Sequence, residues 1–172
     1  CGGDDLRYCD SHRLYSHHSC DGGCSSGRCQ NPSGDICADF VDVPSGGGAF
    51  TADYPSLTDQ VVMPDSSCTG DASTGPDAVY RVQAQAGQTI SVEATPQKSS
   101  DDPVVYITSD CWGAVSTPAT VCLAGDDSNF DGLAESTSYR VPSGRGGTYW
   151  VFVDTDDPAQ AKGNVEVDIG VQ

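Results

Sequence analysis

The chain has 172 residues, which is enough for one principal domain and a small appendage. It carries 25 Asp and Glu residues against 8 Lys and Arg residues, and the resulting net charge of −17 argues against nucleic acid or anionic lipid as a partner. With 20 glycines, 10 prolines and only 19% charged residues, the composition excludes a helical bundle or coiled coil, and no run of about 18 apolar residues could span a membrane.

Nine cysteines indicate a secreted protein, because cytosolic reductants keep thiols reduced whereas extracellular proteins use them as cross-links. Cys1 precedes Gly2 and Gly3, and this start resembles the processed N-terminus of a bacterial lipoprotein, in which the first cysteine carries the lipid. A lipid on Cys1 would then be the only membrane attachment. The alternatives are an arbitrary cut, or a bridge from Cys1 to a second chain. The other eight cysteines can pair completely: Cys9, Cys20, Cys24, Cys29, Cys37, Cys68, Cys111 and Cys122.

Residues 1–36 differ from the rest of the chain, since they hold five of the nine cysteines and all three histidines but few aliphatic residues. A segment of this composition cannot bury a hydrophobic core, so only cross-links could hold its shape. We therefore predict a disulfide knot or connector over 1–36. A zinc or copper site that includes the histidines is disfavoured, because there is no second set of closely spaced ligands. The cysteines expected to pair among themselves are Cys9, Cys20, Cys24 and Cys29.

From Cys37 onward, short runs of β-branched and aromatic residues are separated by Gly, Pro, Ser and Asp turns. Apolar and polar residues alternate within several runs, which turns one face of each strand toward a core. Residues 104–107 are apolar on both sides, as expected for a strand buried between layers. The spacing of the runs predicts an antiparallel β-sandwich over residues 37–172. Strands are expected at 49–52, 60–63, 78–84, 90–94, 104–107, 138–141, 149–153 and 165–171.

Five of these segments resemble, in the same order, the bacterial pre-peptidase C-terminal domain. The resemblance covers about residues 68–172. It implies a jelly-roll-like sandwich that is usually appended to secreted hydrolases or surface proteins and is not itself catalytic. A relative in collagenases binds collagen and uses calcium, but this chain has no peptidase attached and adds Cys111 and Cys122, so collagen binding is not carried over. The segments are GPDAVYRV (75–82), AGQTISV (86–92), DPVVYI (102–107), LAGDD (123–127) and GTYWVFVD (147–154).

Residues 127–132 read Asp-Ser-Asn-Phe-Asp-Gly, which matches the first half of a calcium loop. Oxygens at alternate positions can converge on one cation, and the glycine allows a sharp turn. The second half does not match, because position 12 is Ser138 instead of glutamate; loop 154–157 could supply further oxygens. An ordinary turn on an acidic surface is the alternative. The predicted Ca²⁺ ligands are Asp126, Asp127, Asn129, Asp131 and Glu135.

The four cysteines of the sandwich are expected to form two structural disulfides. Cys111 and Cys122 flank a short loop between two strands, and bridging it would contribute roughly 3 kcal/mol through loop-closure entropy. Cys37 and Cys68 would then tie the start of the sandwich to the segment that enters its first well-marked strand. No Cys-x-x-Cys motif occurs, so redox chemistry is not expected.

No catalytic apparatus is evident, because the sequence lacks a Gly-x-Ser-x-Gly elbow and places no histidine in the sandwich to act as a base. We therefore predict a non-catalytic module, extracellular or on a bacterial outer-membrane surface, that binds an extracellular protein or polysaccharide. One alternative is a subunit of an extracellular filament, in which residues 1–36 connect copies through a donated strand or through Cys1. Another is an accessory domain of a secreted hydrolase.

Overall fold

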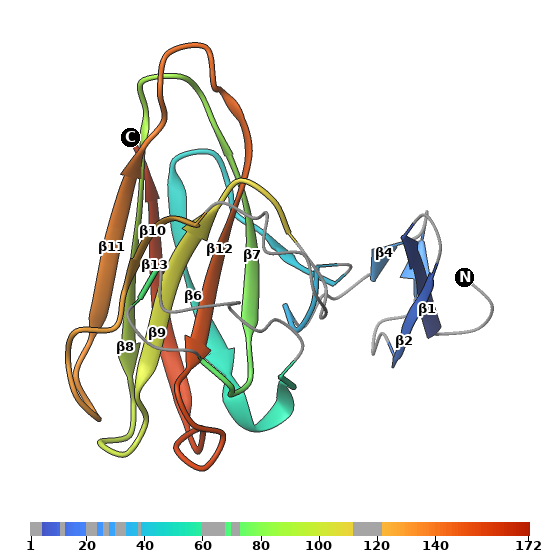
Figure 1. Cartoon of the computed structure of the whole chain (residues 1–172), viewed down its shortest axis with the longest axis vertical. Coiled ribbons are helices and arrows are strands. Elements are labelled where there is room, and N and C mark those ends of the chain that lie inside the picture. Colours follow the sequence, from blue (N-terminus) through green and yellow to red (C-terminus); the bar gives the residue numbers. More distant parts are fainter. Residues whose placement is uncertain are drawn as a thin grey trace.

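The computed structural model describes residues 34–37, 39–59, 68–69, 73–111 and 122–172, and the backbone of four short strands nearer the N-terminus (Figure 1). The third and fourth of these short strands pair with each other, and their register sets Cys24 directly opposite Cys29. Cys1 and Cys20 lie outside the described residues, so the lipid, the pairing within 9–29 and the boundary at residue 36 stay predictions. The four strands, which form two antiparallel pairs, are β1 (Asp5–Asp10), β2 (Arg13–Ser19), β3 (Cys24–Ser25) and β4 (Arg28–Cys29).

Two facing sheets form the sandwich (Figure 1). All neighbouring strands are antiparallel except β5 and β7, so the predicted antiparallel β-sandwich is confirmed. The five-stranded sheet has the order β10 (Cys122–Asp126), β9 (Pro103–Thr108), β12 (Gly147–Thr155), β7 (Ala78–Ala84) and β5 (Val41–Asp42). The four-stranded sheet has the order β11 (Glu135–Arg140), β8 (Thr89–Pro96), β13 (Asn164–Val171) and β6 (Gly47–Asp53).

Hydrophobic alternation decides which way each strand faces. In β13, Val165, Val167 and Ile169 are buried whereas Glu166 and Asp168 are exposed, as predicted. The other predicted strands are found near their expected positions, including the one at 49–52, which lies within β6. The strand predicted at 60–63 falls outside the described residues.

The main core lies between the two sheets. Its centre is made by fully or almost fully buried residues of both layers, such as Ile90 and Val167 from one sheet and Val151 from the other. Each such side chain contributes roughly 1.5–3 kcal/mol relative to an exposed one. A short 3-10 turn, η1 (Tyr54–Ser56), follows β6 and buries Tyr54. Within the described ranges, no helix is long and apolar enough to cross a membrane.

A second apolar cluster covers the outer face of the five-stranded sheet. This explains why β9 is apolar on both sides: Val105 and Ile107 belong to the main core, whereas the alternate residues of β9 belong to the second cluster. Its aromatic rings are in contact, with centroids 5.0 Å apart for one stacked pair. The cluster consists of Phe40, Val79, Val104, Tyr106 and Phe152.

Two disulfides pack against the edge of this second apolar cluster, Cys37–Cys111 and Cys68–Cys122, and each has its Cα atoms 5.6 Å apart. The four cysteines are therefore cross-linked as predicted, but the predicted partners, Cys37 with Cys68 and Cys111 with Cys122, are wrong. The reason lies in the strand register, which sets Cys122 opposite Thr108 at the end of β9.

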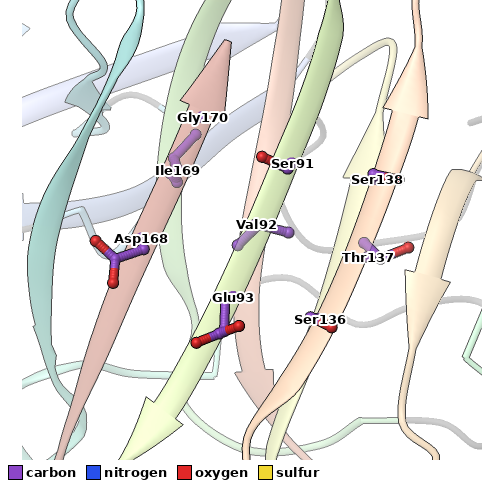
Figure 2. A pocket seen from close by; sticks show the side chains of 9 residues that line it. All are labelled: Ser91, Val92, Glu93, Ser136, Thr137, Ser138, Asp168, Ile169 and Gly170. Atoms are coloured by element: carbon purple, nitrogen blue, oxygen red, sulfur yellow. The ribbon is translucent and has the colours of Figure 1, made fainter. Parts of the chain in front are cut away.

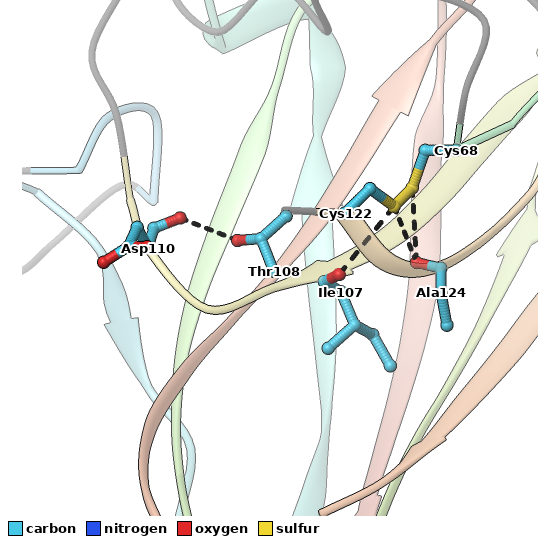
Figure 3. Close-up of a disulfide and its surroundings, with 6 residues drawn as sticks. All are labelled: Cys68, Ile107, Thr108, Asp110, Cys122 and Ala124. Atoms are coloured by element: carbon cyan, nitrogen blue, oxygen red, sulfur yellow. Dashed lines mark hydrogen bonds between the residues drawn. A yellow bond between two sulfur atoms is a disulfide. The ribbon is translucent and has the colours of Figure 1, made fainter. Parts of the chain in front are cut away.

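The neighbourhood of Cys122 is occupied by the segment that carries Cys68 (Figure 3). The Ala124 carbonyl oxygen lies 3.5 Å from the Cys68 sulfur and 3.4 Å from the Cys122 sulfur. Cys111 follows β9 and bridges to Cys37 at the start of the sandwich. Together the two bridges fasten the chain before β5 and the chain before β7 to the β9–β10 side of the sheet.

Candidate functional site

The predicted calcium ligands lie in or beside the β10–β11 loop, at one end of the sandwich (Figure 1). Glu135 is buried, and its carboxylate accepts the backbone N–H groups of Asn129 (2.5 Å) and Ser128 (3.3 Å). Burial raises the pKa of Glu135; those two N–H groups oppose the shift, and the nearby Asp126 carboxyl adds to it. Glu135 thus fixes the backbone of the β10–β11 loop through two hydrogen bonds from its buried position.

Asp131 belongs to a different group of side chains. It accepts a hydrogen bond from Gln160 Nε2 in the β12–β13 loop, at 3.1 Å. It also lies beside Asp102 in the β8–β9 loop, where burial, followed by the charges of Asp131 and Asp156, raises the pKa of the Asp102 carboxyl. Asp126 therefore lies beside Glu135, whereas Asp131 contacts the β8–β9 loop and the β12–β13 loop.

Gly132 makes the predicted sharp turn, with φ of +80°. A Cβ at this position would lie only 2.7 Å from Ser99 Cα, so the close approach of two loops requires glycine. The Gly132 N–H donates to the Asp101 carbonyl oxygen at 2.8 Å, which locks the β10–β11 loop to the β8–β9 loop. Among the described residues, no group of three or more acidic, His or Cys side chains is arranged to hold a metal ion.

Calcium binding stays a prediction, and chelation tests it. If the carboxylates of these loops bind Ca²⁺ with a Kd near 0.1 mM, about 2 mM calcium should stabilise the fold by about 2 kcal/mol and raise the melting temperature by roughly 5 °C relative to excess chelator. Asp131→Ala should reduce this difference, whereas Asp168→Asn, on an outer sheet face, should preserve it. Equal melting temperatures with calcium and chelator, together with no effect of Asp131→Ala, would contradict the prediction.

A pair of acidic residues is buried at the same end of the sandwich as the β10–β11 loop. Asp77 and Asp154 are both fully inaccessible and are hydrogen-bonded through their carboxyl groups. Asp154 also accepts hydrogen bonds from the Ser73 hydroxyl, the Tyr106 hydroxyl (3.1 Å) and the Thr155 N–H (2.7 Å). Burial raises the pKa of the Asp154 carboxyl from 3.8 to about 7, partly offset by these hydrogen bonds. The sequence offered Asp154 only as part of a loop that could supply oxygens to calcium, and it gave no signal for this buried pair.

A shallow groove of about 740 Å³ lies on the outer face of the four-stranded sheet (Figure 2). It crosses β11, β8 and β13, and its outward-facing residues fall into two rows that follow the strand register. The first row is made of small residues, Ser138, Ser91 and Gly170. The second row contains Ser136, Glu93 and Asp168.

Glu93 and Asp168 are direct cross-strand neighbours, and both are exposed (Figure 2). Like charges directly opposite each other on an antiparallel pair are destabilising. Glu166, two residues before Asp168, extends the acidic surface along β13 and accepts a hydrogen bond from Gln97 Nε2 at 3.1 Å. Arg140, at the end of β11, is a cation on this sheet. The groove is thus hydroxylic and acidic, and no aromatic side chain lines it.

No protein-family model matches the chain, and no curated protein matches it in sequence. Three solved structures are similar to 77% of the chain. The first is PliG, a periplasmic inhibitor of g-type lysozyme from Aeromonas hydrophila, with 16% identity, 97% of that chain covered and a TM-score of 0.40. The second is the surface-associated copper-binding protein CorA of Methylomicrobium album BG8, with 10% identity, 98% of that chain covered and a TM-score of 0.45. The third is the pre-peptidase C-terminal domain of a Bacillus anthracis collagenase, with 12% identity, 92% of that chain covered and a TM-score of 0.40. Similarity at this level does not establish membership of the pre-peptidase C-terminal family.

Proposed function

We propose that this chain is a non-catalytic, extracellular binding module that recognises its ligand on the outer face of the four-stranded sheet. The observation that supports this proposal is the difference between the two outer faces. The five-stranded sheet is covered by an apolar cluster bordered by two disulfides. The four-stranded sheet is instead polar and hollowed, and its groove of about 740 Å³ is in the size range of ligand-binding clefts.

The extracellular assignment is supported by the disulfides. Four of the described cysteines are oxidised, and such cross-links persist in secreted or envelope proteins rather than in the cytosol. The net charge of −17 is consistent with a soluble surface that repels anionic partners.

Chemical-shift mapping on the ¹⁵N-labelled full chain tests the proposed face. The probes are a capped peptide of four Lys-Ser repeats, its Glu-Ser counterpart, cellotetraose and chitotriose. We expect at least one probe to shift the backbone amides of β8, β11 and β13, because these strands form the groove, and to leave those of β9 unmoved. Shifts confined to the covered sheet or to the exposed loop tip at Phe130, or no shifts with any probe, would contradict the proposal.

A further inference from the structure

We propose that the groove receives a lysine- or arginine-bearing segment of a basic partner protein, with one cationic side chain held between Glu93 and Asp168. This inference rests on the proposed function, because it names the partner of the same face. Two properties of the groove support it, its charge and its shape.

The charge of the groove favours a cation over an anion as its ligand. The register sets Glu93 directly opposite Asp168, so their Cβ atoms are about 5 Å apart and both side chains leave the same face. Two carboxylates in this position repel each other, and a guanidinium or ammonium group between them would turn the repulsion into two charge-assisted hydrogen bonds. A segment of opposite charge would also associate faster with a chain of net charge −17.

The shape of the groove allows a polypeptide backbone to come close. Beside the two carboxylates runs the row of Ser138, Ser91 and Gly170, none of which projects far from the sheet. A Cβ on Gly170 would lie 2.6 Å from Ser91 Oγ, so the glycine leaves the present position of that hydroxyl open. The row offers hydroxyl groups to a backbone. Because no aromatic ring lines the groove, a sugar would lack a stacking surface, which favours protein over polysaccharide.

Calorimetry with the capped peptide of four Lys-Ser repeats tests this inference on the oxidised full chain. We expect binding that weakens at least tenfold in Glu93→Gln/Asp168→Asn. The matched control is Asp59→Asn/Asp157→Asn, which removes two charges outside the groove and should change the Kd less than twofold. Ser138→Trp fills the small-residue row without removing a charge, and it should also weaken binding at least tenfold. Equal melting temperatures would show that the variants are folded.

Several results would overturn the inference. Equal weakening in both charge-removing variants would mean that the peptide binds through overall charge. Undiminished binding in Ser138→Trp would mean that the peptide does not lie in the groove. If Ca²⁺ or Zn²⁺ alone shifts the amides of residues 93 and 168 and displaces the peptide, the carboxylate pair is a metal site. If cellotetraose or chitotriose shifts the groove amides and the basic peptide does not, the partner class is wrong although the proposed binding face is correct.

Discussion

Replacing Cys37 and Cys111 together by alanine is expected to lower the free energy of unfolding by about 4 kcal/mol. This bridge joins residues 74 positions apart, so it removes much of the conformational freedom of the unfolded chain. It also fastens the segment that contributes Phe40 to the cover of the five-stranded sheet, where that ring packs edge-on against Trp150 at 5.1 Å. Urea denaturation of the double variant and of the wild-type chain measures the difference.

The Cys68–Cys122 bridge, with a separation of 54, should contribute about 4 kcal/mol by the same reasoning. The two closed loops overlap along the chain, so removing both bridges should cost less than the sum of the single losses. Peptide mapping without reduction checks the partners directly. A cross-linked peptide that joins Cys111 to Cys122 would contradict the structure, and an unchanged urea midpoint in both double variants would contradict the stabilising role.

The sandwich could be predicted because its strands alternate apolar and polar residues locally. A strand such as β13 carries its own orientation in the order of Val165, Glu166 and Val167, without reference to its neighbours. The disulfide partners could not be predicted in the same way. Cys111 and Cys122 are close in sequence, but the register of β9 and β10 brings Cys68 to Cys122.

The candidate sites likewise contain features that depend on adjacent residues and features that depend on the pairing of distant strands. The Asp-x-Asn-x-Asp-Gly pattern predicted the sharp turn at Gly132, because a turn depends on adjacent residues. The groove depends instead on pairing between β8 and β13, whose facing residues Glu93 and Asp168 are 75 positions apart in sequence. Alternation showed that both carboxylates point outward, but only the register makes them neighbours.

The buried carboxyl pair provides the second large effect, a loss of stability with rising pH. Burial raises the pKa of the Asp154 carboxyl to about 7, although the hydrogen bond from the Asp77 side chain opposes this shift. The titratable groups around the pair are the hydroxyls of Tyr54 and Tyr106 and the more distant Asp101. The Tyr54 hydroxyl donates to the Asp154 carbonyl at 2.5 Å. None of these groups supplies a positive charge.

The sign of the effect follows from proton binding. Between pH 3.8 and about 7, folded Asp154 keeps a proton that the unfolded chain releases, so the folded state binds more protons and its stability falls as pH rises. The slope is about 1.4 kcal/mol per pH unit, which amounts to about 3 kcal/mol between pH 5 and pH 8. Above pH 7, the buried and ionised Asp154 carboxylate should loosen segment 73–77, because Ser73 and Asp77 both contact Asp154.

Asp154→Asn should abolish most of this pH dependence, because an amide does not titrate and its oxygen can still accept a hydrogen bond from Asp77. At pH 8 the variant is expected to be more stable than the wild-type chain, whereas at pH 4 the two should be similar. Asp168→Asn removes the same charge from an exposed position, and it should keep the slope between pH 5 and pH 8. Urea denaturation at four pH values measures these slopes, and amide exchange in residues 73–77 follows the loosening. A wild-type free energy of unfolding that is flat or rises from pH 5 to pH 8, or equal slopes in Asp154→Asn and Asp168→Asn, would show that the buried pair does not hold the proton.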